Sequence, residues 1–538
     1  MKYIKISIVI LLVSFISIFA YKLTTNNSNN KISLTKEQIK EMLSYTIDGN
    51  KTSSMPTKGS GYKVKSITCK SGSILSWDND NWLLEVEKLE SEDLCNIDFT
   101  TGTGSYTVTA VPSIAGSLDS TSKTTTENGQ VTFYTDLAID SVSGCTNEIS
   151  DGKVIVKNIT SNTTCNVEIT KNIYNMLLIN NPIIKTRTDF SKAYTEENTK
   201  TLFKTQENNT DVYYFAGNAT DNWVKFGKYQ QDEIIYVGNL KGYEGTVRKF
   251  NSLSECSSNT SFENCRKVTL GLKGESIYWR IIRTNADGSI KLLYSGTSHD
   301  TTSGYLSTGT SGFNSSYDSP KYVGYMYGSD DSSLPNARTN TTNSTIKTAI
   351  DNWYASNMTS YTKYLSTTAV YCNERNLRTG DTYSTSSTFY YAPYARVWST
   401  YNPTYDCTEA SDAFSGSNTS AKLTYPIALM TSDEIMRAGG KGGTSLTSPY
   451  AWYYLNSANG SITGDTYWWL MSPSYWNDSC AYVFLVRGSI VPGDLNWNIA
   501  YSSVGVRPVV SLKSCVKYSS GDGSPENPYE IAETTSGC

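Results

Sequence analysis

Histidine is almost absent from this chain, since His299 is the one imidazole among 538 residues. HExxH metal sites, most zinc sites and catalytic groups built on two histidines are therefore excluded. His299 itself lies in a stretch rich in Ser, Thr, Asp and Gly, which predicts a surface loop. An enzyme built on this chain would have to use carboxylates, thiols or hydroxyls.

Charge is also scarce. Lys, Arg, Asp and Glu make up 18% of the residues and the net charge is -4, with no basic run and no helix rich in Lys and Arg. A nucleic-acid partner is therefore not expected. The chain instead has 40 Tyr, 11 Trp and many Ser, Thr and Asn. That composition indicates β-rich domains with polar surfaces, as in extracellular proteins.

No C-x-x-C motif occurs, which excludes a zinc ribbon and a thioredoxin-like redox site. All 11 cysteines follow the first 23 residues, as expected for a protein of an oxidising compartment. Cys480 is left over when near neighbours are paired. The predicted disulfides are Cys69–Cys95, Cys145–Cys165, Cys256–Cys265, Cys372–Cys407 and Cys515–Cys538.

Residues 1–30 predict an export segment and a polar linker. Lys2 and Lys5 precede an apolar run that extends from Ile6 to Ala20. Because Ile18 fits a cleavage site poorly, we expect an uncleaved signal anchor, with a cleaved signal peptide as the alternative. The protein is expected to be extracytoplasmic, either membrane-anchored through this segment or secreted.

Two small β modules are predicted next, at 31–100 and 101–172. The first begins with a short helix, where a capping box at 35–38 is followed by Leu43 and Ile47 on one face. In each module one cysteine ends a strand and its partner begins the last strand. Units of this size bury little core, so a disulfide worth about 2–4 kcal/mol matters. We interpret both as stalk modules.

Residues 173–211 predict a connector, and residues 212–538 predict one α+β domain. The Asp287-Gly288 turn marks the clearest hairpin in the chain. The domain's clearest elements are this hairpin, two helices and two long loops, at 276–294, 344–358, 431–439, 296–333 and 379–417, respectively.

Residues 467–512 differ in character from the rest of that domain. Both ends are apolar and predict buried strands, whereas the middle mixes large aromatic rings with Asn, Asp, Ser and Arg. Such mixtures suit a contact surface, because rigid rings supply area and short polar groups supply hydrogen bonds. The alternative is a hairpin whose aromatic rings face its own core. The candidate ligand-binding residues are Tyr475, Trp476, Asn477, Asp478, Tyr482, Arg487, Asn496, Trp497, Asn498 and Tyr501.

The motifs at 469–473 (Trp-Leu-Met-Ser-Pro) and 505–508 (Gly-Val-Arg-Pro) resemble the C-terminal end of C-type-lectin-like domains. The similar branch includes formylglycine-generating-enzyme-like domains, the variable proteins of diversity-generating retroelements and an uncharacterised surface-protein family of low-GC Gram-positive bacteria. The second β module resembles the small β-repeats of bacterial surface proteins. The resemblance implies that both motifs are framework, that the residues between them form a ligand-binding face, and that the protein acts at the bacterial cell surface. If the chain is a retroelement target, residues 475–503 are hypervariable.

Two pairs of acidic residues are candidates for acid/base catalysis: Glu374 with Asp381, and Asp433 with Glu434. The second pair falls in the first turn of a predicted helix, where capping and the helix dipole explain it. Glu374 is expected to form a structural ion pair with Arg375 and Arg378.

The copper-thiol site of true formylglycine-generating enzymes needs two neighbouring reduced cysteines, and Cys480 is alone near the C-terminal strands. Catalysis is therefore not expected. Residues 476–478 (Trp-Asn-Asp) resemble the sugar-binding motif of calcium-dependent lectins, but the upstream E-P-N or Q-P-D is missing. No cofactor is predicted, and Ca²⁺ is the open alternative because Asp and Asn oxygens suit it.

The sequence thus predicts a multidomain, mainly β surface protein. Two disulfide-stapled β modules precede an α+β C-type-lectin-like domain, which binds an extracellular glycan or protein without catalysis. A structural cell-envelope protein and an extracytoplasmic enzyme on a formylglycine-generating-enzyme-like fold are the alternatives.

Overall fold

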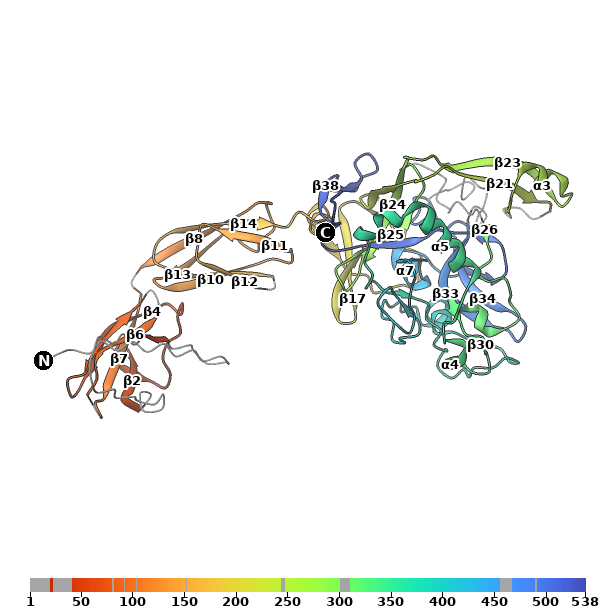
Figure 1. The fold of residues 1–538 in the computed structure, drawn as a ribbon. Coiled ribbons are helices and arrows are strands. Elements are labelled where there is room, and N and C mark those ends of the chain that lie inside the picture. Colours follow the sequence, from red (N-terminus) through yellow and green to blue (C-terminus); the bar gives the residue numbers. More distant parts are fainter. Residues whose placement is uncertain are drawn as a thin grey trace. The chain divides into compact units, whose positions relative to one another are not determined.

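The chain forms two compact units, Met1–Thr170 and Lys171–Cys538, and most of its regular structure is strand (Figure 1). The predicted multidomain, mainly β class is confirmed. The residues predicted to form an export segment lie outside the described residues, apart from the short strand β1 (Ala20–Lys22). No described helix is long and apolar enough to cross a membrane. The computed structural model describes residues 20–22, 41–79, 82–90, 92–102, 104–150, 152–242, 247–299, 310–454, 467–488 and 491–538.

The first module of unit one holds a four-stranded sheet in the order β3-β2-β7-β4 and a three-stranded sheet in the order β1-β6-β5. Trp82, Ile97 and Phe99 lie in its core. Its strands are β2 (Leu43–Ile47), β3 (Asn50–Thr52), β4 (Tyr62–Cys69), β5 (Ile74–Asp78), β6 (Leu83–Lys88) and β7 (Cys95–Thr101).

The predicted short helix does not extend over Leu43 and Ile47: the described helical residues are Glu41 and Met42, and Leu43 and Ile47 lie in β2. This strand pairs in parallel with β7 and antiparallel with β3. Apolar residues four apart are typical of a helix, but a pairing partner fifty residues away is invisible in a local pattern. The capping box predicted at 35–38 lies outside the described residues.

The second module is built of two facing sheets, β11-β14-β8-β9 and β10-β13-β12. Buried and exposed residues alternate along β14, as expected when one face packs on a core and the other meets water. Val108 and Phe133 come from different sheets and share that core. The strands are β8 (Ser105–Pro112), β9 (Ser122–Thr126), β10 (Gly129–Tyr134), β11 (Ile139–Ser143), β12 (Asn147–Ser150), β13 (Lys153–Ile159) and β14 (Thr163–Ile169).

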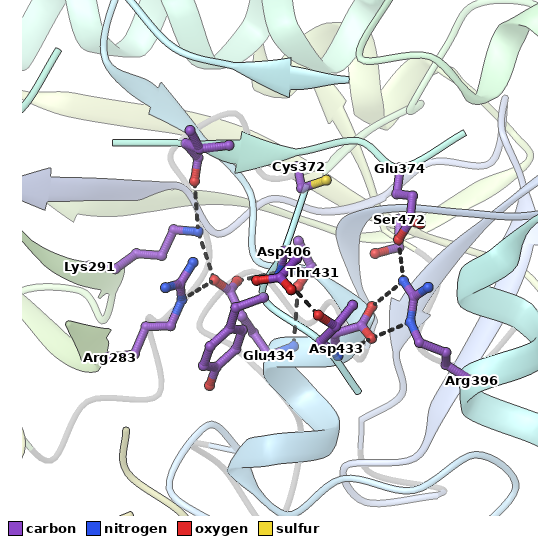
Figure 2. A pocket seen from close by; sticks show the side chains of 13 residues that line it. Arg283, Lys291, Cys372, Glu374, Arg396, Asp406, Thr431, Asp433, Glu434 and Ser472 are labelled. Atoms are coloured by element: carbon purple, nitrogen blue, oxygen red, sulfur yellow. Dashed lines mark hydrogen bonds and ion pairs between the residues drawn. The ribbon is translucent and has the colours of Figure 1, made fainter. Parts of the chain in front are cut away.

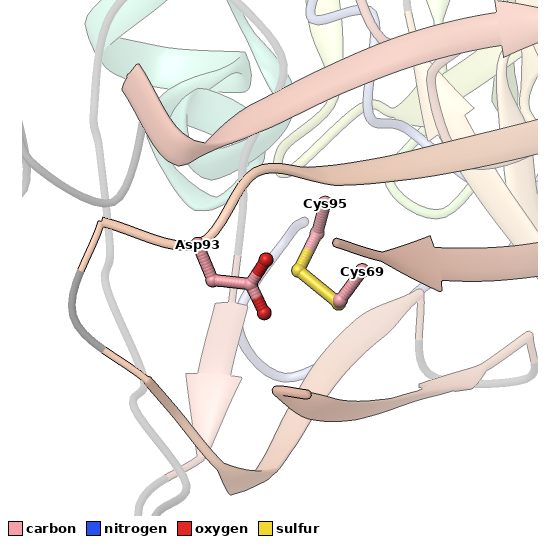
Figure 3. Close-up of side chains that lie close together, drawn as sticks. All are labelled: Cys69, Asp93 and Cys95. Carbon is pink, nitrogen blue, oxygen red and sulfur yellow. A yellow bond between two sulfur atoms is a disulfide. The ribbon is translucent and has the colours of Figure 1, made fainter. Parts of the chain in front are cut away.

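All five predicted disulfides are present, and Cys480 is a free, half-buried cysteine. Asp93 lies beside the Cys69–Cys95 bridge (Figure 3). Its buried carboxylate accepts hydrogen bonds from the backbone N–H groups of Ser71 (2.6 Å) and Ser73 (2.8 Å). Burial raises the pKa of Asp93, but these hydrogen bonds outweigh it and lower that pKa. The two sulfurs are bonded to each other, and the Asp93 carboxylate accepts hydrogen bonds from the backbone. We therefore interpret Cys69, Asp93 and Cys95 as a structural cross-link and not as a metal site.

Unit two is organised around a ten-stranded sheet that contains the predicted hairpin. Its two strands pair antiparallel, with Thr284 opposite Ile290 across the turn, which confirms that prediction. Trp279 and Tyr294 are fully buried there and pack edge-on at 5.8 Å. The sheet includes β15 (Ile183–Lys185), β17 (Thr201–Glu207), β18 (Thr210–Tyr214), β20 (Trp223–Lys228), β24 (Ser276–Thr284), β25 (Ile290–Tyr294), β32 (Ile427–Ala428), β37 (Val509–Leu512), β38 (Tyr518–Ser520) and β39 (Tyr529–Ile531).

Residues 173–211, which were expected to form a connector, lie within unit two. The helix α2 (Ile173–Asn180) buries Ile173 and Leu177 in the unit's main core, and β17 and β18 extend the large sheet. A separate sheet in the order β22-β21-β23 carries the Cys256–Cys265 bridge. The remaining elements of this half are β16 (Glu197–Asn198), β19 (Asn218–Ala219), β21 (Glu233–Leu240), β22 (Val247–Phe250), α3 (Leu253–Ser258) and β23 (Phe262–Gly271).

Both predicted helices exist. The helix α5 (Thr345–Asn357) is capped by Ser344 and buries Ile346, Ile350 and Trp353. The short helix α7 (Ser432–Ala438) begins at a complete capping box. The shorter elements around them are β26 (Thr310–Ser311), η1 (Pro320–Val323), β27 (Met326–Tyr327), α4 (Leu334–Ala337), β28 (Thr342–Asn343), η2 (Thr359–Tyr364) and β29 (Tyr371–Cys372).

The long loop predicted at 379–417 is partly structured. It contains β30 (Phe389–Tyr390), the helix α6 (Ala392–Ala395), the π-helix η3 (Arg396–Thr400) and β31 (Ala413–Phe414). The helices run on from one another, and β30 pairs with β33 of the six-stranded sheet. Its Ser- and Thr-rich composition favoured a loop, whereas the tertiary pairing of β30 favours order.

The stretch 467–512 begins and ends in buried strands, as predicted. It contributes β33 (Trp468–Trp476), β34 (Ala481–Val486), β35 (Leu495–Ile499) and β36 (Val504–Gly505) to a sheet in the order β26-β36-β33-β34-β35. Figure 1 shows β30, β33 and β34 together at one end of unit two.

Candidate functional site: an aromatic face on the second unit

Alternation along β33 divides its aromatic residues between two faces of the sheet. Trp476 points into the core and is 1% exposed, whereas the preceding Tyr475 is half-buried on the opposite face. Tyr390 of β30 lies opposite Tyr475, and Tyr475 lies opposite Tyr482 of β34. The rings of Tyr390 and Tyr475 stack at 5.6 Å, and those of Tyr475 and Tyr482 stack at 4.2 Å and 6°. Three strands therefore present one row of stacked tyrosines.

A second row runs along the helical segment formed by α6 and η3. Tyr394 and Trp398 are four residues apart in this segment and so lie on one side of it. Tyr390, at the end of β30, and Tyr401, directly after η3, flank them. The Tyr390 and Tyr394 rings are 4.3 Å apart, and the Tyr401 hydroxyl donates to the carbonyl of Trp398 (3.1 Å). Short π-helical segments are often found at functional sites.

The two rows meet at Trp497 of β35. Its ring lies 5.6 Å from Tyr475, 5.9 Å from Tyr394 and 5.1 Å from Trp398. All these side chains are half-buried and reach solvent, and the same holds for Tyr401, which is joined to them through its hydrogen bond to Trp398. We refer to the set as the aromatic face: Tyr390, Tyr394, Trp398, Tyr401, Tyr475, Tyr482 and Trp497.

Three of the predicted ligand-binding residues, Tyr475, Tyr482 and Trp497, belong to the aromatic face. Trp476 does not, because it lies in the core. For this residue the alternative holds, in which the aromatic rings of the stretch face the domain's own core. Tyr501 is 52% exposed but stacks on Tyr317 at 4.7 Å, away from the other rings.

Asn477 and Asp478 form the turn between β33 and β34. The Asn477 side-chain oxygen accepts from the backbone N–H groups of Ser479 (3.2 Å) and Cys480 (2.6 Å), and its NH₂ donates to the Tyr482 hydroxyl (3.3 Å). Asp478 is exposed, with φ of 72°, and accepts from the Ser479 hydroxyl. The Trp-Asn-Asp motif thus shapes a turn, and its Asn oxygen is already used.

Asn496 and Asn498 close the open edge of the sheet. On its outer side β35 is paired at Leu495, whose N–H donates to the Lys441 carbonyl (3.3 Å). Beyond Leu495 the backbone N–H groups of alternate residues point away from β34. The N–H of Trp497 donates to the Asn496 side chain (2.9 Å) and that of Ile499 to the Asn498 side chain (2.8 Å). These two predicted ligand-binding residues therefore protect an edge strand from pairing with another chain.

Arg487 is also held in place. Its guanidinium lies 3.6 Å from the carboxylate of Asp494, which is 1% exposed. Burial raises the pKa of Asp494, although hydrogen bonding from Asn496 and the charge of Arg487 oppose this. Arg487 thus offsets a buried acid at the start of β35.

The sequence prediction missed four residues of the aromatic face: Tyr390, Tyr394, Trp398 and Tyr401. Their helical spacing is visible in the sequence. The surrounding Ser, Thr and Gly led to the prediction of a loop. Aromatic residues at helical spacing over so few turns do not by themselves predict a helix.

Beneath the helical row, Arg396 anchors the helix to the body of unit two (Figure 2). Its guanidinium donates to both oxygens of Asp433 (2.6 and 3.0 Å) and to Glu374. Burial alone would lower the pKa of Arg396, but Asp433 and Glu374 raise it. The predicted pairing of Glu374 with Arg375 and Arg378 is wrong, since these arginines bind Asp412 and Asp381.

Glu434 is the centre of the neighbouring charge cluster. It accepts from Lys291 (2.7 Å) and Arg283 (3.0 Å), while its other oxygen accepts from the backbone of Thr431. Arg283 also binds Glu207 (2.8 Å). The cavity among these groups measures about 20 Å³, enough for about one water molecule. Asp433 and Glu434 therefore both have cationic partners, and Glu434 also completes the capping box of α7.

No family model, curated protein or solved structure matches the chain. Its function is therefore inferred from its own residues, above all the aromatic face.

Replacing Arg396 with Met is expected to lower the free energy of unfolding of unit two by about 3–5 kcal/mol, because two buried carboxylates lose their counter-charge. Arg378→Met is the matched control, since Arg378 is 37% exposed and its bond to Asp381 is worth less than about 1 kcal/mol. Urea unfolding followed by near-UV circular dichroism compares the variants. Equal losses would contradict an anchoring role for Arg396.

The edge-strand assignment is tested by Asn496→Ala/Asn498→Ala. Removing both side-chain acceptors leaves two outward N–H groups free, and we expect concentration-dependent association through β35. Asn496→Asp/Asn498→Asp keeps the acceptors and adds charge, so it should remain monomeric. Sedimentation velocity separates the two outcomes, and a monomeric alanine variant would refute the assignment.

Glu434 and Glu374 should affect the pH dependence of stability in opposite directions. Burial raises the pKa of Glu434, but Lys291 and Arg283 lower it below the usual 4.5, so its contribution is present at neutral pH and is lost on acidification. Burial raises the pKa of Glu374, so its contribution is present in acid and is lost as the pH increases. Glu434→Gln should therefore be most destabilising near pH 7, and Glu374→Gln in acid. Unfolding midpoints across pH 3–7 would disprove this if both variants changed in the same direction.

Proposed function

We propose that this is an exported surface protein whose second unit is a C-type-lectin-like domain that binds an extracellular ligand, a glycan or a protein, without catalysis. The single observation that carries the proposal is the aromatic face. Seven half-buried rings from three chain segments converge there, and tyrosine and tryptophan dominate contact surfaces because they offer rigid, amphipathic area.

Several features support binding without turnover. The rings are fixed by packing on one another, so a ligand would meet a surface whose side chains are already ordered, and little side-chain entropy would be lost on binding. The acids of the neighbouring charge cluster, Glu374, Asp433 and Glu434, all have cationic partners. Their cavity holds about one water molecule.

The order of elements and the cysteine chemistry agree with the other parts of the proposal. A hairpin, the helices α5 and α7 and the strands β33–β37 follow in the order that the lectin-like resemblance implies. Five disulfides favour an oxidising, extracytoplasmic environment, where the two stapled modules of unit one would serve as a stalk.

The test is a glycan-array and whole-cell binding screen with residues 21–538, with and without a Ca²⁺ chelator. Tyr394→Ala/Trp497→Ala should lose binding at least tenfold, because it removes the centre of the aromatic face. Tyr317→Ala/Tyr501→Ala removes an exposed pair elsewhere and should bind like the parent. Undiminished binding by the first variant would place the ligand elsewhere, and loss caused by the chelator alone would restore a calcium site.

A further inference from the structure

The hydroxyl groups of the aromatic face are arranged for hydrogen bonding with a ligand. Among the described residues, the hydroxyls of Tyr390 and Tyr394 have no hydrogen-bond partner, and neither is buried away from solvent. Tyr482 uses its hydroxyl to accept from Asn477 (3.3 Å). The face therefore alternates apolar ring carbon with polar hydroxyl at short intervals. A pyranose sugar alternates C–H groups and hydroxyls in the same way.

The charges around the face offset one another. Arg378 lies 4.3 Å from the Tyr390 ring and binds Asp381 (3.0 Å). Lys441 lies 4.3 Å from the Tyr401 ring and has no ion pair in the described part of the chain. Asp478, near Tyr482, likewise forms no ion pair with any described residue. One unpaired cation and one unpaired anion at opposite ends leave no row of positive charge for a polyanion such as a nucleic acid or an acidic glycan.

The shape of the face is that of a strip. The ring centroids of Tyr390 and Tyr394 lie 4.3 Å apart and those of Tyr394 and Trp398 lie 6.4 Å apart, so three rings follow one another along the segment. A succession of single rings suits an extended chain better than a partner that covers a broad patch of about 800 Å², as a typical protein does. The edge beside it is closed by Asn496 and Asn498, so a peptide cannot join as an added strand without displacing them.

We infer that the ligand of the aromatic face is an uncharged polysaccharide chain, lying along the helical row and held by ring contacts and by the hydroxyls of Tyr390 and Tyr394. This inference rests on the function proposed above and adds the class of ligand and the two hydroxyls that recognise it. A protein ligand is the competing outcome of the test.

Affinity electrophoresis of residues 21–538 through gels containing polysaccharide provides the test. The probes are neutral dextran, hydroxyethyl cellulose and galactomannan, with carboxymethyl-dextran and carboxymethyl-cellulose as matched anionic forms, at low and high salt. We expect at least one neutral polymer to retard the protein equally at both salt levels, and its carboxymethylated form to retard it less. Retardation by the anionic polymers alone, lost at high salt, would overturn the inference.

Tyr390→Phe/Tyr394→Phe removes two hydroxyls but keeps the rings and their packing, so folding should be preserved, as thermal unfolding would verify. We expect about tenfold weaker binding, from the loss of two hydrogen bonds to the sugar. Tyr317→Phe/Tyr501→Phe is the matched control and should bind like the parent. Unchanged affinity in the Tyr390/Tyr394 variant would overturn the role of the hydroxyls.

The two proposals fail in different ways. A protein ligand from the cell screen that requires Tyr394 and Trp497, with no retardation by any polysaccharide, would overturn the neutral-glycan inference and leave the proposed function standing. Retardation by a neutral polymer that survives Tyr394→Ala/Trp497→Ala would overturn both, because the ligand would then bind outside the aromatic face.

Discussion

The aromatic face depends on Arg396 and the two carboxylates that it binds. Arg396 lies between Tyr394 and Trp398 in the sequence, but it points into the body of unit two and binds Asp433 and Glu374 there. A helix this short has little intrinsic stability, so tertiary contacts must hold it. Because the guanidinium fixes one side of the helix, the rings of Tyr394 and Trp398 are held on the opposite side, against Trp497.

Sheet geometry supplies the other half of the face. Neighbouring residues of β33 point to opposite faces of the sheet: Trp476 is buried in the core, and Tyr475 is half-buried and reaches solvent. Cross-strand pairing alone then places Tyr390, Tyr475 and Tyr482 side by side. The same sheet ends at β35, whose free N–H groups would attract other strands if Asn496 and Asn498 did not cover them. Along β35, two asparagines that cover backbone N–H groups thus alternate with Trp497, whose ring belongs to the aromatic face.

Local chemistry was predictable from the sequence, and long-range pairing was not. The Asp287-Gly288 hairpin, the Thr431–Glu434 capping box and five disulfides between near neighbours each depend on a short pattern. Leu43 in β2 was assigned to a helix because its partner strand lies far along the chain. Of the aromatic face, Tyr475, Tyr482 and Trp497 were predicted from composition. Trp476 was misplaced because composition carries no information on which side of a strand faces the core.

Composition was also misleading at 379–417, where it suggested a loop and the structure has a helical segment that presents aromatic rings. The Ser- and Thr-rich stretch at 379–417 contains the helical row, which acquires its order from pairing with β33 on one side and from Asp433, the ion-pair partner of Arg396, on the other. Neither partner is near it in sequence. A segment held in this way has its rings ordered before any ligand arrives, and most of its side-chain entropy is lost on folding. A weakly apolar ligand, whose individual contacts are small, benefits most from such an arrangement. For that reason the rigidity of the aromatic face and the neutral, hydroxyl-rich chemistry of its surface favour the same class of ligand.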